Sequence, residues 1–207
     1  MGAIGAASTG AYLAGVGTGL SLIVAIGAQN AFVLKQGLLR QHVFWVCLFC
    51  AVSDAVLIAA GVAGAGAIAE RAPWFLAAMR WGGAAFLIWY GARSARAAWR
   101  GGEALRAAGA APPSLAATLA TIAALTWLNP HVWLDTVVLL GAVSSTWPDR
   151  LSFALGAMSG SFLFFFALGY GARLLAPVFA RPLAWRVLDG LVALVMWSIA
   201  AALIFRG

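Results

Sequence analysis

The sequence predicts an all-α membrane protein with six transmembrane helices, arranged as two inverted repeats of three helices. The first observation is composition: of 207 residues, 64% are hydrophobic and only 9% are charged, whereas a soluble domain carries roughly 25% charged residues. The second is a series of apolar blocks, each near the roughly 20 residues that cross a bilayer core. The third is an echo of motifs between the two halves of the chain. A soluble fold with so few charges could not cover its surface, so we expect lipid around it.

The apolar blocks follow one another along the whole chain. We expect spans at Tyr12–Leu34, Val43–Ala67, Phe75–Trp99, Leu115–Leu140, Leu151–Leu175 and Ala184–Phe205. In the fourth block Asn129-Pro130 should break or kink the helix, because proline lacks a backbone donor and clashes with the carbonyl four residues back. The chain is then a single membrane domain, with one repeat in 1–99, a connecting loop in 100–113 and a second repeat in 114–207.

Three pairs of matching motifs support the repeat. They place Asn30 over Asn129, Gly61 over Gly169 and Trp89 over Trp197, in chain order. A unit of three spans that is repeated in tandem must lie inverted, because an odd number of crossings turns the second copy over. Inverted repeats are typical of secondary transporters, whose substrate site lies near the midplane where interrupted helices meet.

The basic residues predict the orientation of the spans. Most lie after the first, third and fifth spans: Lys35, Arg40, Arg93, Arg96, Arg100, Arg106, Arg173, Arg181 and Arg186. The positive-inside rule places these connections in the cytoplasm and both termini outside, in a multi-pass protein of the plasma (inner) membrane. The net charge of +7 is spread singly, which favours contact with membrane lipids over binding to nucleic acid.

The histidine and cysteine residues do not indicate a metal site or a redox-active site. His42 and His131 are the two histidines, and no His/Asp cluster accompanies them, so we expect no metal and no other cofactor. Cys47 and Cys50 lie in an apolar segment without a second pair. We interpret them as small packing residues.

Two acidic residues inside the predicted spans are the strongest functional candidates. Asp54 lies in the second span and Asp135 in the second half of the fourth. A charge at the bilayer centre costs about 2.5–3.5 kcal/mol on insertion scales, so such residues are rarely kept without a role. We expect both to point into the bundle and to bind a cationic group or carry a proton. The alternative for Asp54 is that an arginine or helix ends hold it and that it only stabilises the fold. The alternative for Asp135 is that it lies closer to the interface and reaches water.

Several neutral polar residues complete the predicted site. Gln29, Asn30, Asn129 and Ser53 are expected to line a substrate site, with Pro130 as a hinge. The carboxamides have two other uses: they can satisfy backbone groups freed by the helix break or hold helices together. The repeat also sets Arg80 near Asp189, and we predict an ion pair between them, acting as a gate or as a structural link.

Four stretches carry a family resemblance. They are "GLSLIVAIGAQNAFVLKQGL" (Gly19–Leu38), "CAVSDAVLIAAG" (Cys50–Gly61), "MRWGGAAFLIWYGARS" (Met79–Ser94) and "TWLNPHVWLDTVVLLG" (Thr126–Gly141). In these stretches the chain resembles the LysE/ArgO family of basic amino-acid exporters. The resemblance covers nearly the whole chain in order. It implies export of L-lysine or L-arginine, driven by protons or the membrane potential, and an essential aspartate pair at Asp54 and Asp135.

Other functions remain open at this point. An exporter of neutral amino acids or of another small cation would share most of these features. An intramembrane hydrolase would need Ser159 or Ser161 as nucleophile and His131 as base. A purely structural membrane protein is a further alternative. The residues do not indicate whether the chain assembles into a homo-oligomer.

Overall fold

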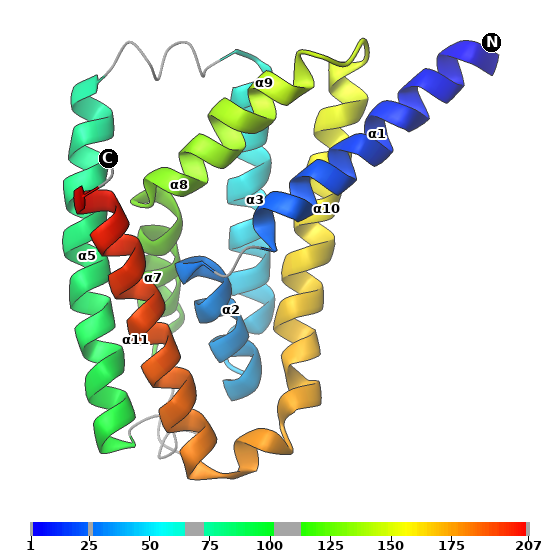
Figure 1. The fold of residues 1–207 in the computed structure, drawn as a ribbon. Coiled ribbons are helices and arrows are strands. Elements are labelled where there is room, and N and C mark those ends of the chain that lie inside the picture. The colour runs from blue at the N-terminus through cyan, green and yellow to red at the C-terminus, as the bar shows by residue number, and fades with distance from the viewer. Residues whose placement is uncertain (1, 25–26, 65–72, 102–112, 206–207) are drawn as a thin grey trace.

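The computed structural model describes residues 2–24, 27–64, 73–101 and 113–205, and in these ranges every regular element is a helix (Figure 1). Residues 65–67 of the predicted second span lie outside the described residues, as does 102–112 of the connecting loop with Arg106. The described chain confirms the all-α prediction.

In the described part of the chain, three helices are long and apolar enough to cross a membrane unbroken. They are α3 (Val43–Val62), α10 (Arg150–Gly171), which continues as a 3₁₀ turn to Leu175, and α11 (Pro182–Phe205). They coincide with the predicted second, fifth and sixth spans. A further long helix, α5 (Pro73–Arg100), has 28 residues and so extends for about 42 Å. It carries arginines at 80, 93, 96 and 100 and does not count among the apolar spans.

Two further helices are broken rather than continuous. α7 (Leu115–Trp127) is followed by α8 (Pro130–Trp133), a π-helical segment (Leu134–Leu139) and α9 (Leu140–Ser144), and the chain bends by 62° between α7 and α8. This confirms the break predicted at Asn129-Pro130. Proline fits the first turn of the new helix, because its missing N–H would have no partner there in any case.

The other break was not expected. The chain bends by 85° between α1 (Gly2–Ile23) and α2 (Ala28–Leu39), so the prediction of one continuous span over Tyr12–Leu34 is wrong. Gly27 precedes α2 with an extended backbone, at φ −115° and ψ 176°. Glycine is a weak helix former, but nothing as strong as a proline marks the position. With each bent pair taken as one span, the described residues hold up to five candidate spans.

The half-helix α2 lies in the middle of the bundle (Figure 1). α3, α7, α10 and α11 all contact it, and eight of its 12 residues are buried. Its first turn therefore lies deep in the protein. Around it α5 and α11 run side by side, α1 packs along α10, and the π-helical segment and α9 pack along α3.

Small residues permit the closest of these helix contacts. A Cβ added at Gly61 of α3 would lie 2.6 Å from the Val137 carbonyl oxygen, and one added at Gly141 of α9 would lie 2.6 Å from that of Gly61. Backbone therefore meets backbone, as is common between membrane helices. Cys47 and Cys50 are buried free thiols on α3, in agreement with a packing role.

The predicted Arg80–Asp189 ion pair is wrong. The Arg80 guanidinium donates to the carbonyl oxygens of Leu203 and Ile204, at 2.6 and 2.7 Å, where it satisfies groups that the end of α11 leaves without helical partners. Residue 203 lies about 21 Å along α11 from Asp189, at 1.5 Å per residue.

Asp189 instead pairs with a residue that we expected outside the membrane helices. The Lys35 ammonium donates to Asp189 Oδ1 at 2.6 Å, and both side chains are buried. Lys35 therefore lies inside α2 and not in the connection after the first span. The pair joins α2 to α11.

Candidate functional site

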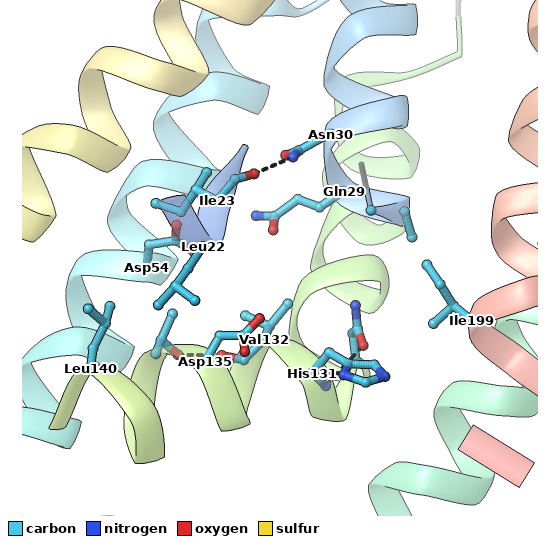
Figure 2. A pocket seen from close by; sticks show the side chains of 14 residues that line it. Leu22, Ile23, Gln29, Asn30, Asp54, His131, Val132, Asp135, Leu140 and Ile199 are labelled. Carbon is cyan, nitrogen blue, oxygen red and sulfur yellow. Dashed lines mark hydrogen bonds between the residues drawn. The ribbon is translucent and has the colours of Figure 1, made fainter. Parts of the chain in front are cut away.

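The two broken helices meet around a cavity of about 250 Å³. α3 and α11 complete its wall, and Figure 2 shows the side chains that surround it. The cavity brings together most of the polar residues singled out in the sequence: Gln29, Asn30, Asp54, Asn129 and Asp135. These residues come from three separate stretches of the chain, so their convergence is a property of the fold.

Asp54 lies in the middle of α3 and is 2% exposed. Its Oδ2 atom accepts a hydrogen bond from the Ser161 hydroxyl of α10 at 2.8 Å. Its Oδ1 atom is buried and has no hydrogen-bond partner among the described residues. A buried carboxylate oxygen without a partner is energetically costly, and this one belongs to a residue that lines the cavity. The arrangement leaves one acceptor available to a ligand.

Ser161 is a site residue that the sequence did not reveal as such. In the sequence it is a candidate only as a nucleophile for the hydrolase alternative. The repeat that aligns Gly61 with Gly169 also aligns Ser53 with Ser161. In the structure its hydroxyl is committed to Asp54, and that of Ser159 donates to the Leu155 carbonyl of its own helix. Neither hydroxyl contacts His131, so the contacts of the described residues do not provide the nucleophile–base pair that hydrolysis needs.

Asp135 lies on the π-helical segment and is partly exposed to the cavity. His131 precedes it by four residues and lines the same cavity, because residues four apart share one helix face. Figure 2 shows both side chains on the α8 side of the cavity. π-Helical turns often occur at functional sites, and this one has no signal in the sequence.

The α1–α2 break supplies hydrogen-bond donors. The Gln29 side chain extends across the cavity toward Asp54 (Figure 2), and its Nε2 atom is buried without a hydrogen-bond partner among the described residues. Gly27, the N-cap residue of α2, has no side chain to cap the helix. The first turn of α2 therefore has no side-chain cap from this residue. It lies at the positive end of the helix dipole, and Gly27 and Ala28 line the cavity.

Both asparagines satisfy backbone groups at the breaks. Asn30 Nδ2 donates to the Ile23 carbonyl oxygen at 2.6 Å, linking α2 back to the end of α1. Asn129 Oδ1 accepts from the His131 amide at 3.2 Å and thereby caps α8. Of the roles open to these residues, these contacts match the satisfaction of freed backbone groups. Both residues still line the cavity.

Ser53 does not line the cavity with the other predicted site residues. Its hydroxyl accepts a hydrogen bond of 3.2 Å from the Trp127 indole, which ties α3 to the end of α7. Ser53 therefore faces α7, whereas its neighbour Asp54 lines the cavity. Pro130 is the first residue of α8 and is buried at the break.

The electrostatic character of the cavity follows from its lining. The described residues that line it include two carboxylates, Asp54 and Asp135, and no lysine or arginine. No group of three or more potential metal ligands occurs in the described part of the chain. The cavity therefore suits an organic cation, and the carboxamide and backbone donors of α2 suit an anionic group.

Comparisons with known proteins agree with this geometry. Residues 20–207 match the family model described as LysE type translocator. The chain is 45% identical to the arginine exporter protein ArgO of Pectobacterium atrosepticum, over 95% of this chain and 97% of the relative. It is 44% identical to that of Yersinia enterocolitica, with the same coverage, and 43% identical to that of Salmonella typhi, over 95% and 94%. No solved structure matches the chain. The chain belongs to the LysE type translocator family.

Proposed function

We propose that this protein is a secondary transporter that exports basic amino acids, L-arginine or L-lysine, from the cytoplasm across the plasma (inner) membrane. The observation that carries the proposal is the shared cavity of Asp54 and Asp135, with no lysine or arginine in its described lining. The relatives named as arginine exporters match over nearly their whole length, which supports the same substrate class.

The proposed binding mode uses the acceptors and the donors of the cavity for different parts of the substrate. A guanidinium or ammonium group offers several N–H donors and no acceptor, so it fits the open Oδ1 of Asp54 and the carboxylate of Asp135. The substrate carboxylate needs donors, and Gln29 Nε2 and the uncapped first turn of α2 provide them. Helix N-termini favour anions for the same reason.

The proposal includes six spans in two inverted repeats, with α5 as the third span. Each half has one broken helix, and the breaks meet at the cavity. The halves also exchange contacts in the same way. α3 of the first half contacts α9 of the second half, where a Cβ added at Gly141 would meet the backbone of Gly61. Likewise, α10 of the second half contacts α2 of the first half, where a Cβ added at Gly37 would meet the backbone carbonyl of Gly169. Gly61 and Gly169 are positions that the sequence repeat aligns.

Alternating access then follows from movement of one half against the other around the cavity, with Gly27 and Pro130 as hinges. The C-terminal ends of α2, α5 and α10 lie at the same end of the molecule (Figure 1). Arg40, Arg100 and Arg173 lie at these ends, so we assign that end to the cytoplasm. Protons or the membrane potential would supply the driving force.

A flux assay tests this function. The purified protein in lipid vesicles is given radiolabelled arginine, lysine, threonine or leucine, with and without an imposed pH gradient. We expect flux of the two basic amino acids and loss of that flux in Asp54→Asn and Asp135→Asn. Asp149→Asn is the matched control, because Asp149 lies outside the cavity as the N-cap of α10 and asparagine also caps helices well.

Three outcomes would overturn parts of the proposal. Full, pH-independent flux in Asp54→Asn would remove that acid from the mechanism. Threonine or leucine flux equal to arginine flux would make the protein a neutral amino-acid exporter. No flux of any of the four would refute transport of amino acids.

A further inference from the structure

A second polar pocket, of about 90 Å³, lies between α2, α5 and α7. Its lining begins on α2 beyond the residues of the central cavity and continues toward the C-terminal end of that helix. Its polar side chains include Lys35, Gln36, Gln41, Arg93, Ser94 and Thr118, with no carboxylate among the described lining residues. This composition contrasts with that of the central cavity, whose described lining holds two carboxylates and no lysine or arginine.

Two aromatic side chains lie at one end of the second pocket. Phe32 and Tyr90 line the second pocket on the side nearer the central cavity, with ring centroids 6.3 Å apart in an edge-on arrangement. Phe32 lies one helical turn after Gln29, which lines the central cavity. Gln29 and Gln36 are seven residues apart on α2, or about 10.5 Å at 1.5 Å per residue. The pocket and the cavity are therefore consecutive spaces along one helix.

The charge of the second pocket resides mainly in one side chain. The Lys35 ammonium is bonded to Asp189 at 2.6 Å, so that pair adds no net charge. Arg93 is exposed, with its guanidinium 6.0 Å from the centre of the Trp89 ring. A guanidinium matches the planar geometry of a carboxylate. The pocket can thus attract an anionic group while it remains open to the outside of the bundle.

The carboxamides of the pocket add acceptors. Gln36 is 6% exposed, and its Oε1 atom is buried without a hydrogen-bond partner among the described residues. The same holds for Oε1 of Gln41. An ammonium group carries three donors and no acceptor, so it would satisfy both oxygens. A carboxylate beside Arg93 and an ammonium beside the two glutamines together describe the head group of a free amino acid.

We propose that this pocket is a second substrate site, at which the α-carboxylate and α-ammonium groups of an amino acid bind before the substrate passes Phe32 and Tyr90. This inference rests on the proposed transport function. The pocket is much smaller than the central cavity, so it holds the head group rather than the whole substrate. The pocket recognises the α-carboxylate and α-ammonium groups that all amino acids share. Asp54 and Asp135 of the central cavity then select substrates with a cationic side chain. Basic residues at the ends of α2 and α5 place it on the cytoplasmic, substrate-loading side.

The first test compares two arginines on the same helix. Arg93→Gln removes the charge from the pocket, whereas Arg96→Gln removes an exposed charge that does not line it. For arginine supplied from the cytoplasmic side we expect the KM to rise roughly tenfold or more in Arg93→Gln, because a hydrogen bond to a charged group is lost. We expect kcat to stay near the wild-type value and Arg96→Gln to behave as wild type. Inhibition by arginine methyl ester, which lacks the carboxylate charge, should not change in Arg93→Gln.

A labelling experiment tests the pocket without removing any of its charges. Thr121→Cys places a thiol in the lining, while the native Cys47 and Cys50 are buried and give a low background. A small water-soluble thiol reagent should label this variant from the cytoplasmic side. Arginine and leucine should both slow the labelling, because both carry the head group. Agmatine, which is arginine without its carboxylate, should not slow it.

The outcomes separate this inference from the proposed function. If wild-type protein transports arginine but Arg93→Gln and Arg96→Gln have equal KM values, the second site is refuted and the transport function stands. Labelling that neither arginine nor leucine slows refutes the site as well. If the wild type transports no arginine, the proposed function fails, and protection by leucine alone would then support a head-group site in a protein of other specificity.

Discussion

The Ser161 hydroxyl of α10 donates a hydrogen bond of 2.8 Å to Oδ2 of Asp54 on α3, while Oδ1 of the same carboxylate has no partner among the described residues. The contact joins the two helices that occupy equivalent places in the proposed repeats. It also orients the carboxylate, because one oxygen is held and the other remains available. Ser161 is therefore a positioning residue for Asp54 in the proposed mechanism.

Replacement of Ser161 by alanine should weaken substrate binding. A hydrogen bond to a charged group contributes about 1.5–3 kcal/mol, so we expect the KM for arginine to rise by about 10- to 100-fold in Ser161→Ala. Ser159→Ala is the control, since that hydroxyl bonds only within α10. The measurement is initial-rate flux in vesicles at several arginine concentrations. Equal KM values for the two variants would show that the Ser161 contact does not position Asp54 for binding.

The Lys35–Asp189 ion pair should dominate the stability of the contact between α2 and α11. Lys35→Met removes the ammonium from a buried carboxylate, which typically costs about 3–5 kcal/mol. The double variant Lys35→Met/Asp189→Leu should recover most of that loss, because apolar residues of similar size replace buried ion pairs well. Thermal unfolding in detergent, analysed as a double-mutant cycle, measures the coupling. Additive losses in the double variant would contradict the prediction.

The close approach of α3 to the π-helical segment should make Gly61 intolerant of a side chain. In Gly61→Ala the new Cβ would lie 2.6 Å from one backbone oxygen and 2.7 Å from the next, and overpacking of this kind costs about 1–3 kcal/mol. Gly82→Ala is the control, because a Cβ there meets nothing within 4 Å. In a helix interior that change should stabilise by up to about 1 kcal/mol. The unfolding temperatures should therefore shift in opposite directions, and a rise for both variants would rule out the close backbone contact.

The N-cap of α10 should make stability depend on pH in the acid range. The Ser152 amide at 3.0 Å and hydroxyl at 2.7 Å both donate to Asp149, and these bonds lower its pKa from 3.8 to about 2. A lowered pKa in the folded state means that the ionised cap stabilises the protein fully above about pH 4, near the unfolded value. That contribution is lost as the pH falls toward 2.

Unfolding temperatures of the wild type and Asp149→Ala between pH 2 and pH 7 measure this effect. The wild type should be more stable near neutral pH, and the difference should shrink as the pH falls from 4 to 2. Asp149→Asn retains an N-cap acceptor but has no charge to lose. A difference between the wild type and Asp149→Ala that is constant over the whole range would mean that the cap does not act through its charge.

The sequence by itself determined the features that depend on local chemistry. Low charge and long apolar blocks require a membrane, proline at 130 ends a helix wherever it lies, and acids within apolar segments must turn away from lipid. The four motif stretches also sufficed to indicate the family. These inferences held because each depends on a residue and its immediate neighbours along the chain.

Only the tertiary structure decided which side chains meet. Asp54 finds its hydroxyl donor 107 residues away, and Lys35 finds its carboxylate 154 residues away. Arg80 lies near the end of α11 rather than near Asp189, because that choice depends on how far two helices slide along each other. The break before α2 and the π-helical turn at Asp135 likewise became evident only in the structure. No short stretch of sequence specifies how two helices are positioned along each other, since one pattern of apolar residues is compatible with many pairings of helices.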